Sequence, residues 1–191
     1  LSMVTDGHKD YIALTPENYY QASKGAHGLL AFEQQGRLMA FEQFDLRFNR
    51  PDLVLQKMGI ASDTVVKAYY HAFQKRLGKM GFTEAMLGQD FDLPELAILD
   101  KDIPLSTVAR SLSVQIKATG AQHPLDRINV FINDVPVFGT QGINLRFKNT
   151  RQHEQTLTLA LAPGENKIQI SVLNQAGAES LKETFYVTCT A

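Results

Sequence analysis

The chain has 191 residues, of which 44% are hydrophobic and 20% are charged, and these fractions are ordinary for a globular protein. Its formal net charge is −1, so the charge balance favours neither nucleic acid nor an anionic membrane surface as a partner. The apolar runs are only a few residues long, far short of the ~20 residues that a membrane-spanning helix needs. We therefore expect no nucleic-acid partner and no insertion into a membrane.

The chain has one cysteine, Cys189, which cannot form an internal disulfide. This composition fits a reducing compartment such as the cytoplasm, although one missing disulfide leaves the compartment open. No signal-peptide pattern is visible. Because the sequence starts Leu1-Ser2, we expect it to be cut from a longer protein or to carry the remnant of an expression tag, and a signal peptide would then lie outside it.

The first fifty residues predict two β-hairpins. Short β-prone runs at 1–4 and 11–14 flank an Asp-Gly turn signal, and a second pair of runs at 29–32 and 38–41 flanks a Gly-containing turn at 34–37. Between the hairpins, a Thr-Pro-Glu-Asn turn leads to two tyrosines and a polar, glycine-containing loop.

The periodicity then changes to that of two helices, at about 51–58 and 63–80. Pro51 suits the first turn of a helix, Gly59 supplies a stop, and Ser62 is expected to cap the second helix. Apolar residues recur at three- and four-residue steps along the second helix, which predicts one buried stripe. The stripe consists of Val65, Val66, Tyr69, Phe73, Leu77 and Met80.

From Pro94 onward apolar and polar residues alternate, which is typical of strands with one buried face. The alternating runs are centred on residues 112–118, 128–132, 157–161, 168–172 and 185–189, with further strands expected at Glu95–Leu99 and Ile143–Phe147. Seven or eight strands in ~100 residues predict an immunoglobulin-like antiparallel β-sandwich over 94–191. The fold class is therefore mainly β with a helical insert, in which residues 1–93 form a β-hairpin and helix segment. Membership of the antibody branch is excluded, because the chain has no tryptophan and one cysteine.

Several stretches resemble a known arrangement of domains. Residues 15–23 read TPENYYQAS and look like the TPxxYYxAS element in the closing portion of certain bacterial WD-repeat proteins. Residues 41–55 contain EQF and RPDLVL and resemble the segment that follows that element. Residues 161–170 resemble the LxPGENxIxV turn and strand of bacterial Ig-like modules, and residues 174–180 continue such a module.

Together these stretches resemble the region between a WD-repeat propeller and a caspase-like peptidase domain in large bacterial multidomain proteins. The resemblance implies an interdomain position and an Ig-like module. The peptidase domain of that arrangement would begin at about Ala191, so the resemblance assigns its activity to no residue of this chain.

Cys189 is the sole candidate for a thiol nucleophile. It is in phase with Phe185 and Val187, which places it on the inward face of the last strand. A thiol buried among apolar groups has a raised pKa and is unreactive. Its flanks also lack a caspase active-site signature, so we interpret Cys189 as structural.

Three groups of polar residues were weighed as metal or catalytic sites. The histidines show no metal-ligand spacing and are interpreted as surface or packing residues: they are His8, His27, His71, His123 and His153. Four aspartates cluster where the sandwich begins and either bind calcium or are simply solvated: Asp90, Asp92, Asp100 and Asp102. A third cluster is either catalytic or, more simply, local ion pairing at a helix N-terminus: Asp45, Arg47, Arg50 and Asp52.

Aromatic residues are concentrated in the first fifty positions. They predict a small core between the N-terminal strands and the helices, or a contact surface for a neighbouring domain. The set consists of Tyr11, Tyr19, Tyr20, Phe32, Phe41, Phe44 and Phe48. The paired glycines at 25 and 28 and at 139 and 142 lack the context of a phosphate-binding loop and are interpreted as turn formers.

The sequence therefore predicts a non-enzymatic structural or protein-interaction module that acts as an interdomain connector in a larger multidomain protein. We assign no catalytic, cofactor-binding or metal-binding residues and no cofactor. The expected partners are flanking domains of the same chain or other proteins, and self-association is an open alternative because sheet edges offer unpaired backbone. Two other functions remain open: a β-sandwich that binds carbohydrate or calcium, and a regulatory segment of an adjacent caspase-like peptidase.

Overall fold

The computed structural model describes residues 1–34 and 36–191, and for residue 27 it describes the backbone alone. Gln35, in the turn of the second predicted hairpin, and the side chain of His27 therefore lie outside the described part. The chain divides into two compact units, Leu1–Gly88 and Gln89–Ala191. Each unit has its own core and is described by itself.

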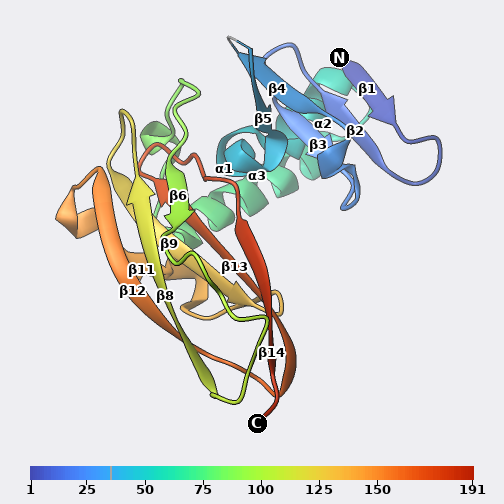
Figure 1. Cartoon of the computed structure of the whole chain (residues 1–191). Coiled ribbons are helices and arrows are strands. Elements are labelled where there is room, and N and C mark those ends of the chain that lie inside the picture. Colours follow the sequence, from blue (N-terminus) through green and yellow to red (C-terminus); the bar gives the residue numbers. More distant parts are fainter. Residues whose placement is uncertain (35) are drawn as a thin grey trace. The chain divides into compact units, whose positions relative to one another are not determined.

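The first unit begins with a three-stranded antiparallel sheet in the order β1-β2-β3 (Figure 1). Strands β1 (Ser2–Thr5) and β2 (Tyr11–Leu14) form the first predicted hairpin, which is confirmed. Strand β3 (Tyr20–Ala22) pairs with β2 and was not predicted. It is too short to show an alternation of its own, and it forms because Tyr20 is fully buried against the unit's core.

The second predicted hairpin is also confirmed. Strands β4 (Ala31–Gln34) and β5 (Arg37–Ala40) pair antiparallel. They lead into a 3-10 turn, η2 (Phe41–Phe44), and a single helical turn, α1 (Asp45–Phe48), neither of which was predicted. Both contain only four residues, and helical periodicity cannot be read from so short a run.

The two predicted helices are present as α2 (Pro51–Met58) and α3 (Asp63–Lys79). Gly59 has φ +69, the left-handed conformation that ends a helix and that glycine adopts without steric cost. Ser62 occupies the N-cap position of α3, but its hydroxyl makes no capping hydrogen bond. The expected side-chain cap is therefore wrong, although the helix start is correct.

The buried stripe of α3 is narrower than predicted. Val65 and Tyr69 are 42% and 40% exposed, so these two assignments are wrong. They lie about one residue, or 100° of helix rotation, away from the line of buried and half-buried residues. That line runs at steps of four, three and four through Val66, Tyr70, Phe73 and Leu77.

The aromatic residues of the first unit form the predicted small core. The rings of Phe32 and Phe41 are stacked with centroids 4.0 Å apart, and Tyr20 meets Phe41 edge-on at 5.3 Å. Phe48 contacts Phe32 at 5.2 Å. Such pairs stabilise a core beyond the area they bury. Tyr11 is the exception in the predicted set, because it is 36% exposed.

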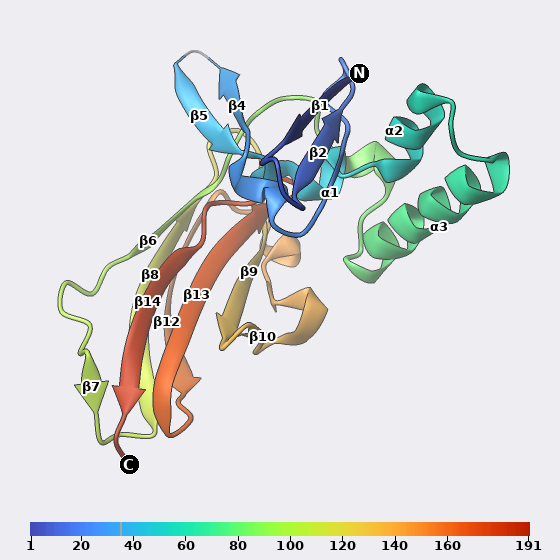
Figure 2. The same cartoon turned by 90° about the vertical axis from the view of Figure 1, so that its right-hand side faces the viewer.

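The second unit consists of two sheets that face each other and are antiparallel except for one short parallel pair at an edge of the larger sheet (Figure 2). The smaller sheet has the order β12-β8-β6 and contains β12 (Gln152–Ala160), β8 (Ser111–Thr119) and β6 (Glu95–Ile98). The larger sheet has the order β10-β9-β13-β14-β7, with β11 also paired to β9. Its strands are β7 (Ser106–Thr107), β9 (Leu125–Ile132), β10 (Val135–Pro136), β11 (Ile143–Asn144), β13 (Gly164–Asn174) and β14 (Glu183–Cys189).

This topology confirms the immunoglobulin-like sandwich and the mainly β class. The inward positions of the alternating runs form one core, and those from β8 and β13 are completely buried apart from Leu112, which is partly buried. The fully buried members of these two strands are Val114, Ile116, Ala118, Ile168, Ile170 and Val172.

The strand expected over Ile143–Phe147 is shorter than predicted. Strand β11 ends at Asn144, and a 3-10 turn, η5 (Arg146–Lys148), follows it. Asn149 closes that turn with φ +45. The side chain of Arg146 donates to the buried carboxylate of Asp126, and the backbone here follows the turn instead of pairing with β9. The next residue, Phe147, is 77% exposed.

The first strand of the sandwich begins at one end of it, and the last strand finishes at the opposite end. Strand β6 begins with Glu95 opposite Thr119, next to the loop 120–124, and we call this the leading end. Strand β14 finishes with Cys189 opposite Gly164, at what we call the trailing end. Figure 1 shows the C-terminus at this trailing end.

Candidate functional site

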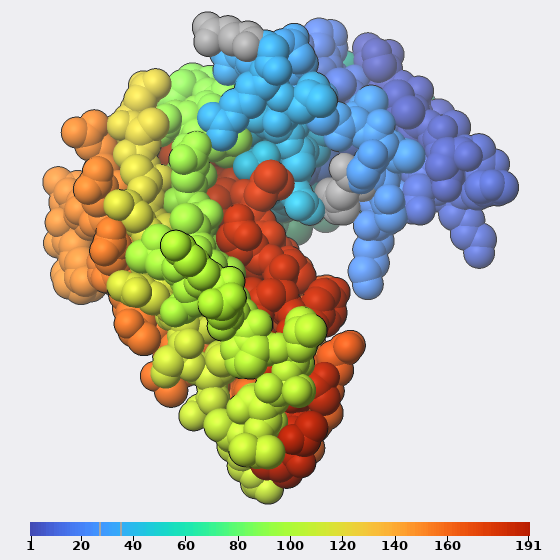
Figure 3. Space-filling model, viewed as in Figure 1, coloured from blue at the N-terminus to red at the C-terminus, as the bar shows by residue number. Residues whose placement is uncertain are grey.

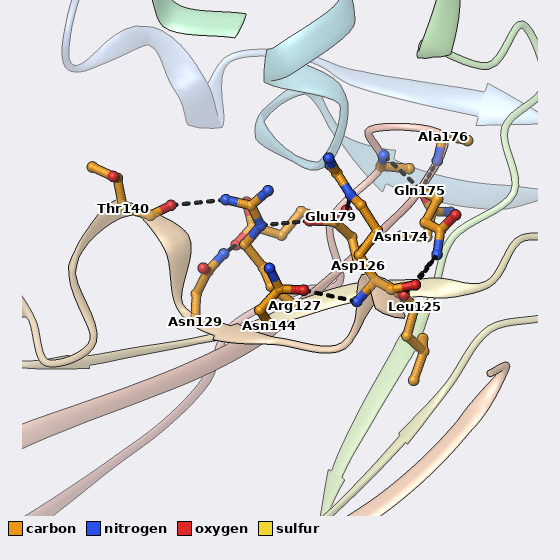
Figure 4. Close-up of polar contacts among 12 residues, drawn as sticks. Leu125, Asp126, Arg127, Asn129, Thr140, Asn144, Asn174, Gln175, Ala176 and Glu179 are labelled. Atoms are coloured by element: carbon orange, nitrogen blue, oxygen red, sulfur yellow. Dashed lines mark hydrogen bonds and ion pairs between the residues drawn. The ribbon is translucent and has the colours of Figure 1, made fainter. Parts of the chain in front are cut away.

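Buried polar residues gather at the leading end of the sandwich (Figure 4). Asp126 is 1% exposed and lies between two arginines. Its Oδ1 accepts from Nε of Arg127 at 2.6 Å, and its Oδ2 accepts from Nε of Arg146 at 2.5 Å. Arg127 also donates to the carbonyl of Thr140 at 2.8 Å. Oδ2 thus holds β9 to the turn that contains Arg146, and Oδ1 holds the side chain of Arg127, which reaches the segment at Thr140.

Glu179 ties the loop after β13 to the outer face of the larger sheet. It accepts from Nδ2 of Asn129 at 3.0 Å and from the hydroxyl of Ser171 at 2.5 Å. Ser171 is fully buried. Its hydroxyl therefore donates its proton to a structural partner and cannot meet a substrate, so the pair is not a nucleophile with its base.

Asn174 links three segments of the leading end. Its Nδ2 donates to the carbonyl of Asp92 at 3.1 Å, and its Oδ1 accepts from the main-chain N–H groups of Ala176 at 3.1 Å and Ala178 at 2.9 Å. Asn174 is fully buried. These hydrogen bonds offset the free-energy cost of removing its side-chain amide from water. The next residue, Gln175, donates its main-chain N–H to the carbonyl of Pro124.

The four aspartates weighed as a calcium site do not converge. Asp90 contacts Nε2 of His123 at 2.8 Å, while Asp92 accepts from main-chain N–H groups of the loop 120–124 at 3.1 and 3.2 Å. Asp100 accepts from a main-chain N–H of β8, and Asp102 is exposed. Within residues 1–34 and 36–191, no group of three or more His, Cys, Asp or Glu side chains is placed to hold a metal ion.

Cys189 faces inward, as its phase in the last strand predicted. It is 2% exposed and belongs to the core of the sandwich. Its thiol lies 3.5 Å from the carbonyl oxygen of Ala109. The thiol is therefore shielded from solvent.

Three of the remaining histidines have described side chains. His153 contacts the side chain of Gln155 at 3.0 Å, and His8 and His71 are exposed. Within the second unit, His123 pairs with Asp90.

The charge cluster of the first unit does not form one group, and within it Arg50 and Asp52 show the local ion pairing that the simpler interpretation expects. Arg50 and Asp52 form a buried two-pronged ion pair with distances of 2.9 and 2.7 Å. The guanidinium of Arg50 also lies over the ring of Phe73 at 4.2 Å. Arg47 instead donates to the carbonyl of Gly88 at 2.5 Å.

Asp45 accepts a hydrogen bond from the buried phenol of Tyr20. Its Oδ1 accepts from the hydroxyl of Tyr20 at 2.7 Å and from Nδ2 of Asn49 at 2.9 Å, and Arg76 approaches its Oδ2 at 3.4 Å. Burial, followed by the adjacent carboxylate of Asp45, raises the pKa of Tyr20 far above its ordinary value of 10.0. The phenol is therefore a permanent hydrogen-bond donor rather than an acid or base.

A small hollow of about 190 Å³ lies beside α3 in the first unit. Arg76 forms part of its wall and donates to the carbonyl of Asn49 at 2.7 Å. Small-molecule pockets usually measure about 300–1,000 Å³, so this hollow suits a single side chain rather than a whole metabolite. Its lining consists of Asn49, Pro51, Tyr69, Ala72, Phe73 and Arg76.

The polar network at the leading end was not predicted from the sequence. The sequence contains one indication of this network: Asp126 is in phase with the inward-facing Ile128 and Val130. A charge at an inward position requires a partner, and Arg127 or Arg146 could then have been sought. The roles of Asn174 and Glu179 carry no comparable signal.

Comparisons with known proteins identify no family. No family model matches the chain, and no curated protein matches it. Among solved structures, the fibronectin(III)-like modules of Clostridium thermocellum CbhA match with 12% identity and a TM-score of 0.40, over 52% of this chain and 47% of that one. The SrpA adhesin R347E mutant from Streptococcus sanguinis matches with 14% identity and a TM-score of 0.37, over 54% and 60%.

An endo-beta-1,4-mannanase from Thermotoga petrophila matches with 12% identity and a TM-score of 0.34, over 66% of this chain and 23% of the mannanase. The chain thus spans less than two thirds of the length of each of these three structures. The class that the fold defines is a mainly β chain with an immunoglobulin-like sandwich. No described helix is both long and apolar enough to cross a membrane.

Proposed function

We propose that the chain is a non-enzymatic structural and protein-interaction module that connects domains of a longer protein. The observation that carries this proposal is that the first strand of the sandwich begins at one end and the last strand finishes at the opposite end. Segments attached at the two ends are held apart by the length of the strands. A nine-residue strand such as β12 spans roughly 30 Å at ~3.4 Å per residue.

A spacer of this kind has to be rigid. The side-chain hydrogen bonds at the leading end restrict the motion of its loops. The loops there are tied down by Asp126, Asn174 and Glu179, whose partners come from separate segments of the chain. Loops without such ties are normally the mobile parts of a sandwich.

The polar groups best suited to chemistry support a structural role. Asp126 is neutralised by two arginines, Ser171 donates to Glu179, and Cys189 lies in the core. Each of these groups stabilises the scaffold instead of facing a substrate.

Paired spin labels test the spacer directly. Gln122 at the leading end and Glu165 at the trailing end are both exposed, and each can be replaced by cysteine while Cys189 stays buried. We expect one narrow distribution of distances between the two labels, and the same distribution at all temperatures below unfolding. A broad or two-peaked distribution would contradict a stiff connector.

An activity assay tests the non-enzymatic part. We expect the intact chain to hydrolyse a panel of fluorogenic peptides no faster than buffer does. Turnover by the intact chain that disappears in Cys189→Ala would overturn the proposal.

A further inference from the structure

The sandwich has one long sheet edge and three short ones. Strand β7 and strand β10 have two residues each, and β10 ends in Pro136, which has no N–H to offer. Strand β6 has four residues. Strand β12 has nine, and it borders the smaller sheet opposite β6. Orange atoms line the left margin of the sandwich in the space-filling view, on the side where β12 lies (Figure 3).

The backbone groups of β12 that point away from the sheet can be assigned from its pairing with β8. At one end of the strand the carbonyl of Arg151 accepts from Gly120 at 2.8 Å, and at the other end Leu161 donates to Arg110 at 3.0 Å. In an antiparallel ladder the residues that bond to the neighbour alternate with residues whose N–H and C=O point outward. The odd-numbered residues of β12 therefore bond to β8, and the even-numbered residues point outward.

The outward backbone of Glu154, Thr156, Thr158 and Ala160 makes no hydrogen bond within the described part of the chain. The outward groups of Gln152, by contrast, bond to the hydroxyl of Thr150. Natural edge strands are usually protected by lysine, proline, a bulge or a short length. Strand β12 has none of these, because it contains no lysine or proline and its nine pairs with β8 run without a register shift.

We propose that β12 is the interface for a second copy of this chain, paired antiparallel about a twofold axis at Thr156. In this register Thr156 faces Thr156 of the other copy, and Glu154 faces Thr158. All of these are outward-pointing residues, so each such pair exchanges two main-chain hydrogen bonds. The two smaller sheets then join into one continuous antiparallel sheet.

The side chains along β12 suit this symmetric arrangement. The sole charged residue of the strand is Glu154, which already pairs with Lys117 at 3.1 Å. In the proposed register the Glu154 side chains of the two copies stand four residues apart, so like charges do not face each other. The threonines that meet at the axis are β-branched and favour a pleated surface.

A second copy fits this edge better than a flexible peptide does. Both copies of β12 are already extended and held by nine pairs with β8, so pairing them requires little further ordering. A free peptide would lose its conformational freedom on binding. The inference concerns the sandwich alone and does not depend on the proposed connector function.

Sedimentation equilibrium of the intact chain tests the interface. We expect a concentration-dependent dimer, and we expect Thr156→Lys to abolish it, because two lysines would then meet at the twofold axis. Ser113→Lys is the matched control: Ser113 is exposed on the same sheet, one strand in from the edge, opposite Thr158. It should leave the dimer intact. Both variants should unfold at similar denaturant concentrations, which shows that the sandwich remains folded.

Disulfide trapping tests the register. Residues that form a hydrogen-bonded antiparallel pair have Cα atoms about 5.5 Å apart, within the range for a disulfide. Thr156→Cys should therefore give a covalent dimer under mild oxidation. In Thr158→Cys the two new cysteines would lie four residues apart along the strands, about 14 Å, and should not link. The unchanged chain, whose Cys189 is buried, gives the baseline.

Three results would overturn the proposal. A chain that stays monomeric at every concentration would do so, as would equal loss of the dimer in Thr156→Lys and Ser113→Lys. Disulfide dimers that form equally well in Thr156→Cys and Thr158→Cys would also contradict it, because they would indicate random collision rather than a fixed register.

Discussion

At the scale of single residues, burial decides which polar groups stabilise the protein. Tyr20 is fully buried and donates to Asp45 at 2.7 Å. Because burial and the adjacent carboxylate disfavour its ionised form, the pKa of Tyr20 is raised above the unfolded value of 10.0. The folded state therefore binds this proton more tightly than the unfolded state does, and the resulting stability is complete below pH 10 and is lost as the pH rises further.

Tyr20→Phe should lower the free energy of unfolding by about 1–2 kcal/mol at neutral pH, because the bond to Asp45 is lost. The difference between the variant and the unchanged chain should shrink as the pH rises above 10.0, where ionisation of Tyr20 destabilises the unchanged chain alone. Urea unfolding at a series of pH values measures both effects. Tyr69→Phe, at a tyrosine 40% exposed, is the control and should change neither. A constant difference at all pH values would contradict this account of Tyr20.

Asp126→Asn should lower the free energy of unfolding of the sandwich by about 3–5 kcal/mol, because Arg127 would remain buried without its carboxylate. The side chain of Arg127 is 3% exposed, so water cannot replace that partner. Asp134→Asn is the matched control: Asp134 pairs with Lys167 at 2.9 Å but is 72% exposed, so its loss should cost less than about 1 kcal/mol. Equal effects of the two changes, measured by urea unfolding, would show that the buried cluster is not structural.

At the scale of elements, regular patterns predicted structure well and short or mixed patterns did not. The long alternating runs predicted β8, β9, β12, β13 and β14, because each shows several repeats of period two. The short elements β3 and α1 contain three and four residues and carry too little periodicity. The residues along α3 were assigned to a buried stripe that was too wide, since spacing alone does not reveal how much of a helix its neighbours cover.

The two sides of α3 should respond differently to truncation. Leu77 is 2% exposed, so Leu77→Ala should cost about 2–5 kcal/mol by leaving a cavity. Val65 is 42% exposed, so Val65→Ala should stay within about 0.5 kcal/mol of the unchanged chain. Helical circular dichroism during urea unfolding measures both. A large loss for Val65→Ala would mean that the predicted wide stripe is correct after all.

At the scale of the whole molecule, the sequence predicted two parts, and it could not predict the contacts that complete the second one. Asn174 bonds to Asp92 across 82 positions of sequence, and such a contact leaves no local pattern. Asp92 also accepts from the N–H groups of Gln122 and His123. A boundary drawn where the strand alternation begins, at Pro94, leaves Asp92 outside the sandwich.

A chain of residues 89–191 should therefore fold on its own with a higher thermal midpoint than a chain of residues 94–191. Removal of Asp92 leaves the buried amide of Asn174 and two loop N–H groups without their partner, and each kcal/mol lost lowers the midpoint by about 4–8 °C in a domain of this size. Calorimetry of the two chains measures the difference. Equal midpoints would mean that Asp92 contributes nothing to the sandwich.

The most direct test of the central claim, that buried polar residues hold the leading end rigid, is amide hydrogen exchange of the unmodified chain. The main-chain N–H groups of Ala176, Ala178, Gln122 and His123 bond to Asn174 or Asp92. We predict that these loop amides exchange nearly as slowly as those of the central strands, and far more slowly than those of the exposed residues Lys101 and Asp102. Exchange of all six at the rate of an open loop would contradict the claim.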